Sequence, residues 1–467
     1  MATTDLTRTP SSGGNRKTWT FSAWLKRASK SDANNSRIFS AGGSQTDYTS
    51  WFMYAVDGTD GALQLQNRIS NSTTALKTNR KFRDVNGWYH LVIACDTTQA
   101  TASNRIKIYV NGVQETSFST EQYPAQDADT FVNHTVEHNI GSADGTTYTP
   151  RYWAGSMSHV ALVDGQQLTP TSFGLTDSTT GQWKFKSPSL TWGTNGFHLK
   201  FENSGNMGLD SSGQTNNYTV SGGTLTQSID TPSNSYCTLN PFHSQSEVGG
   251  ATFFHGNLKI ETTAQGGGPY TGTTGTTMAF NKGKWYWEVK LKTAASTYPN
   301  VGVGEATQPI TGANNYLDDV TNFNNINLSC YGTTGNFRRT GRSTQNLNVD
   351  GGFSVNDIVM VAFDYDNDKI WFGKNGTWFA SGNPSTGANA NETGFISAIT
   401  PNDDYVMPYI GDGNYATSCG FEVNFGSGFF GQTAITSAGS NGNGSLFEYD
   451  VPTGFYALNT KNLNTYG

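Results

Sequence analysis

The 467-residue chain contains few charged residues, and those it has do not cluster. Asp, Glu, Lys and Arg together make up 14% of the sequence, and the formal net charge is −7. Lysine and arginine never form a run longer than a pair, and the small patch of Arg338, Arg339 and Arg342 is typical of a solvated loop. Nucleic-acid binding through a basic surface that follows the phosphates is therefore not expected.

Cysteine and long apolar runs are also scarce. The four cysteines show no C-x-x-C spacing, so they predict neither a zinc site nor a disulfide framework, and Cys95 fits a buried thiol in a strand. The sequence shows no run of eighteen apolar residues and no charged-then-apolar signal sequence at its start. We therefore expect a soluble protein that is made in a cytoplasm.

What the chain has in quantity is glycine, with 54 residues, and aromatic side chains, at 13%. Thr, Asn, Ser and Gly dominate over the Glu, Lys, Ala and Leu that long amphipathic helices need. This balance favours many short strands joined by tight turns, and the length favours two or three domains. The predicted fold class is all-β, with two antiparallel β-sandwiches joined by an irregular connector.

The clearest strands lie in the second half of the chain. Residues 284–289, 357–364 and 369–376 alternate between apolar and polar residues, and Asp-Asn-Asp and Lys-Asn-Gly supply hairpin turns. With the Val-Gly repeat at 301–304 before them and residues 421–426 after, they resemble the SPRY family over roughly residues 240–430. The resemblance implies a β-sandwich used for recognition rather than chemistry.

The first half contains a second series of strands. Residues 18–25 alternate, residues 87–93 carry Trp-Tyr-His before an apolar run, residues 105–113 contain Tyr-Val-Asn-Gly, and residues 152–165 supply a late Gly-x-apolar strand. This order resembles the laminin-G-like, concanavalin-A-like lectin jelly rolls. The resemblance covers most of the first half and implies a lectin-like domain.

The predicted domains are 1–205 (lectin-like), 206–240 (connector), 241–432 (SPRY-like) and 433–467 (C-terminal tail). The connector is poor in residues that could build a core, so we expect it to lie over a surface. Residues 192–241 and 451–463 resemble virion proteins of tailed bacteriophages, in particular marine cyanophages. The resemblance implies a virion component. By analogy with phage fibres, which are commonly homotrimers, it also implies a trimer.

Catalytic and metal motifs are weak. A hydrolase on the lectin-like fold needs two carboxylates that flank the scissile bond, and the only acidic motif is Glu448-Tyr449-Asp450, outside both sandwiches. Residues 364–368 open like a calcium loop, but Lys369 and Asn375 stand where that loop requires Gly and Glu. The seven histidines show no pairing in the sequence. We expect no enzyme activity and no cofactor, with calcium in the first domain left open; its candidate ligands by residue type are Asp57, Asp60, Asp96 and Asp164.

Binding is better supported than catalysis. A sugar site combines an aromatic platform with polar contacts, and sandwich folds present such residues on loops. The candidate contact residues in the first domain are Tyr48, Trp51, Tyr148, Arg151 and Tyr152. Those in the second domain are Tyr298, Asn300, Tyr316, Arg338, Tyr409, Asp412 and Tyr415.

The resulting hypothesis is a non-enzymatic phage structural protein, located in the virion. It would be a tail-fibre or accessory component whose partners are other virion proteins or host cell-surface polysaccharide. Two alternatives stay open: a capsid decoration protein with a purely structural docking role, and a polysaccharide-degrading glycoside hydrolase. The sequence identifies neither the ligand nor the position on the particle.

Overall fold

The structure of the protein is a computed structural model, and it describes residues 4–28, 36–42, 44–54, 61–143, 151–244, 251–262, 273–294, 299–308, 310, 323–331, 334–340, 352–401, 405–412, 418–435, 439 and 442–467. Of residues 329–331 and 334–338 only the backbone is described. The chain divides into two compact units, residues 1–227 with 231–233 and residues 228–230 with 234–467.

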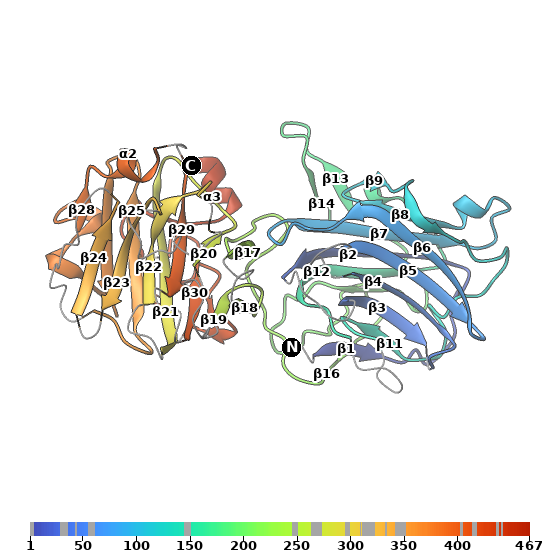
Figure 1. Cartoon of the computed structure of the whole chain (residues 1–467). Helices are drawn as coiled ribbons and strands as arrows, with labels where there is room; N and C mark the ends of the chain where they lie inside the picture. The colour runs from blue at the N-terminus through green and yellow to red at the C-terminus, as the bar shows by residue number, and fades with distance from the viewer. Residues whose placement is uncertain are drawn as a thin grey trace. The chain divides into compact units, whose positions relative to one another are not determined.

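The first unit contains two antiparallel sheets (Figure 1). The larger has eight strands in the order β10-β6-β5-β4-β3-β11-β1-β16. In that order they span Phe118–Glu121, Ser72–Lys81, Ala62–Ile69, Tyr48–Met53, Ser36–Gly42, His138–Ile140, Asp5–Arg8 and Thr219–Ser221. The smaller sheet has six strands in the order β15-β12-β2-β7-β8-β9. They span Phe197–Leu199, Gly155–Asp164, Thr18–Arg27, Trp88–Asp96, Ile106–Val110 and Val113–Gln114.

The core of the first unit lies between these two sheets, because alternation along each strand directs one set of side chains inward. Trp19 and Phe21 on β2, Phe39 on β3 and Trp51 on β4 are each 0% exposed and belong to one hydrophobic cluster. Full burial of one such side chain contributes about 1.5–3 kcal/mol of transfer free energy. This cluster therefore holds the two sheets together.

The second unit has two sheets of its own. The smaller one follows the order β17-β20-β29-β22-β23-β24. Its strands span Leu239–Ser244, Thr274–Thr276, Val406–Asp412, Pro299–Glu305, Asn325–Tyr331 and Thr334–Arg339. The larger one follows the order β18-β19-β30-β21-β25-β26-β27. Its strands span Ala251–Phe254, Lys259–Thr262, Cys419–Asn424, Lys284–Ala294, Ile358–Asp364, Lys369–Lys374 and Thr377–Trp378.

Short elements complete both units. The first unit adds a hairpin of β13 (Gly174–Thr176) and β14 (Trp183–Phe185). The second adds β28 (Glu392–Thr393) beside β26, β33 (Tyr456–Ala457) beside β21, and the hairpin of β31 (Phe429–Phe430) and β32 (Thr433–Ala434). The helical elements within the described ranges are η1 (Ala102–Asn104), η2 (Pro170–Ser172), η3 (Phe379–Ser381), η4 (Pro384–Thr386), α2 (Ile396–Ile399) and α3 (Thr460–Tyr466). The prediction of an all-β chain with two antiparallel sandwiches is confirmed.

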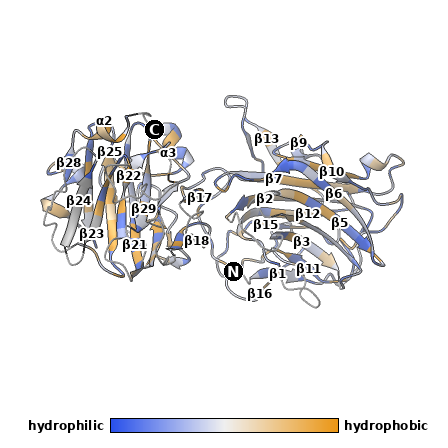
Figure 2. Ribbon diagram, in the orientation of Figure 1, coloured by the Kyte–Doolittle hydropathy of each residue, from blue (hydrophilic) through white to orange (hydrophobic). Residues whose placement is uncertain are grey.

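The turns follow the sequence closely. Asn111 and Gly112 join β8 to β9 with φ values of 49° and 82°, and Asn375 and Gly376 join β26 to β27 with 49° and 86°. Positive φ at both central residues defines the type I′ turn, whose twist matches that of a two-stranded ribbon. Along strands such as β5 and β21, hydrophilic and hydrophobic residues are interspersed, as alternation requires (Figure 2).

The segment 206–240 is not a connector along its whole length. Within it, β16 pairs with β1, and Tyr218 is 3% exposed with its ring packed on Phe197 of the first core. Tyr236 and Cys237 are buried in the second unit. The passage from one unit to the other is thus confined to residues 228–233.

The segment 433–467 is likewise part of the second unit and not a separate tail. Phe447, Val451 and Phe455 are buried in one cluster with Tyr286 and Trp371 of the larger sheet. β33 pairs with β21, and the N–H of Cys237 donates to the carbonyl of Leu458 at 3.0 Å. The C-terminal segment therefore covers the outer face of this sheet.

Candidate functional site

Tyr48 and Trp51, predicted as neighbouring loop contacts, are both on strand β4 and point to opposite faces. Trp51 is 0% exposed, with ring centres 4.3 Å from Phe39 and 5.7 Å from Trp19. A ligand at the surface cannot reach it, so Trp51 is a core residue and the prediction of a contact role is wrong. Tyr48 is half-buried, and its hydroxyl donates to Oε1 of Gln66 at 3.0 Å.

Several predicted positions fall outside the described residues, namely Tyr148, Tyr298, Tyr316, Tyr415 and the side chain of Arg338, as well as Asp57 and Asp60. Arg151 and Tyr152 are half-buried in the extended segment that precedes β12. They lie far from Tyr48 in the sequence and precede a strand of the six-stranded sheet, whereas Tyr48 belongs to the eight-stranded sheet.

In the second unit, Tyr409, Asn300 and Asp412 are buried in strands and not displayed on loops, with exposures of 0%, 0% and 1%. The Tyr409 ring lies over glycines: a Cβ on Gly304 would lie 3.2 Å from it, and a Cβ on Gly275 would lie 3.0 Å from it. Its hydroxyl donates to the carbonyl of Glu305 at 2.9 Å. These residues pack the sheet, so the predicted surface contacts are wrong for them.

The face of the eight-stranded sheet that points away from the core carries the best candidate site. Paired residues on neighbouring strands share a face. The register of β3, β4 and β5 therefore places Ser40, Ser50 and Gln66 in one row. The next row contains Arg37, Phe52 and Gln64. We call this surface the β4–β5 face and define it by Tyr48, Ser50, Phe52, Tyr54, Gln64, Gln66 and Arg68, flanked by Arg37 and Lys77. Ser50 and Phe52 are 1% exposed and Arg37 is 8% exposed, so these three support the face from beneath, and a ligand meets mainly the half-buried side chains among the others.

Two tyrosine–glutamine pairs organise the β4–β5 face. The hydroxyl of Tyr48 donates to Oε1 of Gln66, and the hydroxyl of Tyr54 donates to Oε1 of Gln64 at 2.7 Å. Each bond fixes the orientation of a side-chain amide. Because an amide bonded through its oxygen keeps both N–H groups as donors, the face presents oriented donors beside aromatic rings.

Two cations lie on the same face and stack on aromatic rings. The guanidinium carbon of Arg37 is 3.9 Å from the ring centre of Phe52, and Nη1 donates to Oγ of Ser50 at 2.6 Å. Nζ of Lys77 is 4.0 Å from the ring centre of Tyr54. Cation–π contacts of this kind hold a long side chain in one position, which adds positive potential to the face.

Most residues of the β4–β5 face are absent from the predicted contacts, although the sequence contains a pattern that groups them. Tyr48, Ser50, Phe52 and Tyr54 occupy every second position, as do Gln64, Gln66 and Arg68, so period-two alternation groups them. The predicted loop at Tyr-Thr-Ser-Trp is instead the start of strand β4. A strand interpretation would have separated Tyr48 from Trp51.

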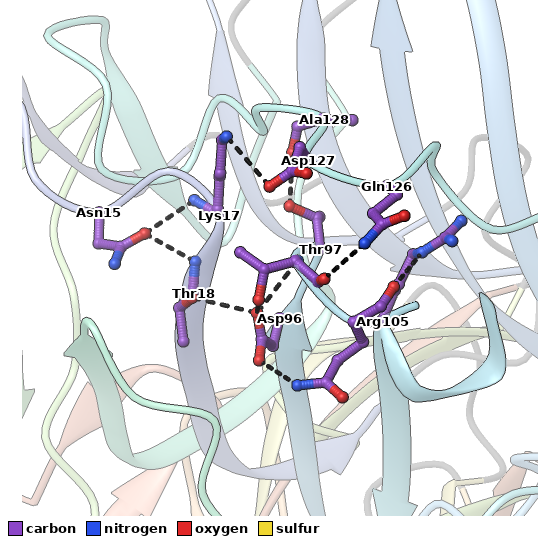
Figure 3. Close-up of polar contacts among 11 residues, drawn as sticks. Asn15, Lys17, Thr18, Asp96, Thr97, Arg105, Gln126, Asp127 and Ala128 are labelled. Atoms are coloured by element: carbon purple, nitrogen blue, oxygen red, sulfur yellow. Dashed lines mark hydrogen bonds and ion pairs between the residues drawn. The ribbon is translucent and has the colours of Figure 1, made fainter. Parts of the chain in front are cut away.

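Asp96 was a candidate calcium ligand by type, and the structure surrounds it with donors (Figure 3). Oδ1 accepts from the N–H and Oγ1 of Thr98 at 3.1 and 2.6 Å, and Oδ2 accepts from Nε2 of Gln99 at 2.6 Å. Burial opposes ionisation, but these hydrogen bonds prevail and hold the pKa of Asp96 below its usual value. The carboxylate closes the loop after β7.

Asp164, a second candidate ligand, is engaged in the same way. It accepts from the N–H of Asn15 at 2.8 Å, from Nδ2 of Asn133 at 3.0 Å and from the N–H of Asn195 at 3.0 Å. It thus ties three segments to the end of β12. Within the described part of the chain, no three His, Cys, Asp or Glu side chains form a group that could hold a metal ion.

A buried carboxylate does lie near the acidic motif 448–450, and it is Glu288 of β21. Its oxygens accept from the hydroxyl of Tyr286 at 2.9 Å and from the N–H groups of Glu448 and Tyr449 at 3.0 and 2.9 Å. Burial raises the pKa of Glu288 to about 7. The carboxyl group fixes the C-terminal segment on the sheet, and its hydrogen bonds account for its position.

The histidines, which seemed unpaired in the sequence, make specific contacts. Nδ1 of His159 and Nε2 of His198 are 3.2 Å apart, and burial lowers the pKa of each to about 4. Nε1 of Trp183 donates to Nδ1 of His90 at 2.9 Å, while Nε2 of His90 lies 2.9 Å from Oγ of Ser22. The bond from Trp183 to His90 fastens the β13–β14 hairpin to the six-stranded sheet.

Among the described residues, no helix has the length and apolar character needed to cross a membrane.

Two family models match this chain. Residues 2–173 match the Concanavalin A-like lectin/glucanases superfamily in a laminin G model, and residues 284–423 match the SPRY domain. No curated protein matches.

Solved structures with a similar fold include the SPRY domain of human HERC1, at 14% identity and a TM-score of 0.29, covering 40% of this chain and 96% of that one. Domains LG4-5 of the mouse laminin alpha1 chain match at 13% identity and a TM-score of 0.28, covering 88% and 81%. A pentraxin from Limulus polyphemus matches at 19% identity and a TM-score of 0.26, covering 35% and 71%. The chain thus carries a laminin-G-like, concanavalin-A-like lectin domain followed by a SPRY domain.

Proposed function

We propose that this protein is a non-enzymatic component of a tailed-phage virion, and that its first domain binds glycans of the host surface through the β4–β5 face. The observation that carries the glycan assignment is the combination on one sheet face of tyrosine rings, oriented amides and stacked cations. A pyranose ring offers an apolar side for stacking and a rim of hydroxyl groups for hydrogen bonds, which this combination satisfies.

The composition of the face also favours binding over hydrolysis. Retaining and inverting glycosidases need two carboxyl groups about 5–10 Å apart. Among the described strand positions that share the β4–β5 face, Asp5 on the distant strand β1 is the single carboxylate. A reducing-sugar assay with host capsule or lipopolysaccharide is expected to give no product, and product formation would establish the hydrolase instead.

The virion assignment rests on the resemblance of residues 192–241 and 451–463 to phage virion proteins. The protein would act as part of the phage particle. Lectin and SPRY domains are general carbohydrate- or protein-binding modules, which fits a part that contacts a host or a neighbouring subunit. Immuno-electron microscopy distinguishes the two roles. Labelled tail tips support host attachment, whereas label over the head supports a capsid decoration protein.

The glycan site is tested by Tyr48→Ala in the whole protein. We expect this variant to lose at least about tenfold in binding to host polysaccharide, because it removes an aromatic platform and frees the Gln66 amide. Tyr152→Ala, in the other predicted cluster, serves as the comparison. Unchanged binding by Tyr48→Ala, with an unchanged melting temperature, would place the site elsewhere.

A further inference from the structure

We propose that the β4–β5 face binds an extended linear glycan that lies along strand β5, with Gln64 and Gln66 contacting consecutive sugar residues. This inference rests on the proposed function of the first domain. It adds the form of the ligand and the two residues that recognise it.

The face contains the same contact twice. By register, Tyr48 lies opposite Arg68 and Phe52 lies opposite Gln64. Tyr48 therefore reaches its glutamine diagonally from one end of β4, and Tyr54 reaches the other glutamine from the opposite end. Diagonal neighbours are about 7–8 Å apart at their Cα atoms, which a tyrosine side chain spans.

Each pair leaves a donor for a ligand. The tyrosine hydroxyl occupies Oε1 of its glutamine, and neither Nε2 of Gln64 nor Nε2 of Gln66 donates to any residue that the structure describes. Gln64 is 7% exposed and Gln66 is half-buried, so both amides are held against the sheet by their surroundings. Ligand atoms at these two points must accept hydrogen bonds, as hydroxyl, ring, carboxylate or acetyl oxygens do.

The spacing favours a chain over a single sugar. Gln64 and Gln66 are two residues apart on one strand, or about 7 Å, which is comparable to the advance of a polysaccharide by one residue. Tyr48 and Tyr54 are six positions apart, or about 20 Å between their Cα atoms in an extended chain. Both side chains lean inward to the glutamines between them, so a ligand that contacts both rings as well as both amides extends beyond the two sugars at Gln64 and Gln66. Affinity should therefore grow with chain length.

The experiment is calorimetric titration of the whole protein with oligomers of two, four and six residues, in three classes: glucose, N-acetylglucosamine and galacturonate. We expect the hexamer of at least one class to bind at least about tenfold more tightly than its dimer. The three classes separate neutral, acetyl and carboxylate acceptors as the groups that the amides recognise.

Gln66→Glu and Gln64→Glu test the amides directly. Each variant keeps an oxygen for the tyrosine hydroxyl, but it replaces the remaining donor with an acceptor, so the hexamer should bind at least about tenfold more weakly. Gln114→Glu on β9 of the other sheet makes the same change of charge at an exposed position and should bind like wild type.

The outcomes are distinguishable. Wild-type affinity in both glutamate variants, or a dimer that binds as tightly as the hexamer, would overturn this inference while the glycan-binding function stands. Failure of every oligomer and of host polysaccharide to bind the wild-type protein would overturn both.

Discussion

Replacing Trp51 with alanine is expected to lower the melting temperature of the first domain strongly, because Trp51 is a core residue and not a ligand contact. The side chain is 0% exposed, and its ring lies close to three others, with centres 4.3 Å from Phe39, 4.7 Å from Phe21 and 5.7 Å from Trp19. Trp19 and Phe21 belong to the opposite sheet. The substitution therefore opens a cavity at the point where the two sheets meet.

The magnitude follows from this environment. A buried tryptophan replaced by alanine costs about 3–5 kcal/mol, and loss of contact with three rings places Trp51 at the upper end of that range. In a domain of 150–250 residues, 1 kcal/mol lowers the melting temperature by about 2–4 °C. We expect a decrease of roughly 10–15 °C for the transition of the first domain.

Differential scanning calorimetry of the whole protein measures this shift, and Tyr48→Ala provides the matched control. Tyr48 lies three positions before Trp51 on the same strand but on the other face, half-buried, so its loss should lower the melting temperature by less than about 3 °C. Equal shifts in the two variants would refute the assignment of Trp51 to the core and of Tyr48 to the outer face.

Two further predictions concern the second domain. Burial raises the pKa of Glu288 from 4.5 to about 7, so its contribution to stability is complete below pH 4.5 and is lost as the pH rises through 7, by up to about 3 kcal/mol. Urea unfolding at several pH values should show this decrease in the wild-type protein and a weaker pH dependence of the unfolding free energy in Glu288→Gln. The same pH dependence in both proteins would show that Glu288 is not the group responsible. Gly302→Ala should destabilise by about 1–3 kcal/mol, because its Cβ would lie 2.4 Å from the carbonyl oxygen of Ile326. A Cβ on Gly13 would have no atom within 4 Å, so Gly13→Ala should leave the stability of the first domain unchanged. Equal losses of stability in the two alanine variants would count against this reasoning.

The candidate site could be predicted only in part. Of the two residues near position 50 that the sequence predicts as contacts, Tyr48 lies on the outer face of the sheet and Trp51 does not. The choice of Trp51 failed because the run Tyr-Thr-Ser-Trp-Phe-Met contains large side chains on both parities, so alternation alone does not tell which set faces the core.

Tyr409 illustrates a second reason why a buried residue can look like a surface contact in the sequence. In the sequence it stands beside Gly411 and Asn414 and looks like a loop aromatic. In the structure it covers Gly275 and Gly304, which come from two other strands. Glycine there leaves room for the ring, and a contact between residues more than a hundred positions apart leaves no local pattern.

By itself, the sequence determined the all-β class, the strands β21, β25 and β26, and the Asn-Gly turns, because period two and positive φ are properties of neighbouring residues. Only the tertiary structure decided where the boundary between the units falls, that the C-terminal segment covers a sheet, and that Tyr48 and Tyr54 orient Gln66 and Gln64. Those features depend on strand register, and register is set by packing across the whole sheet.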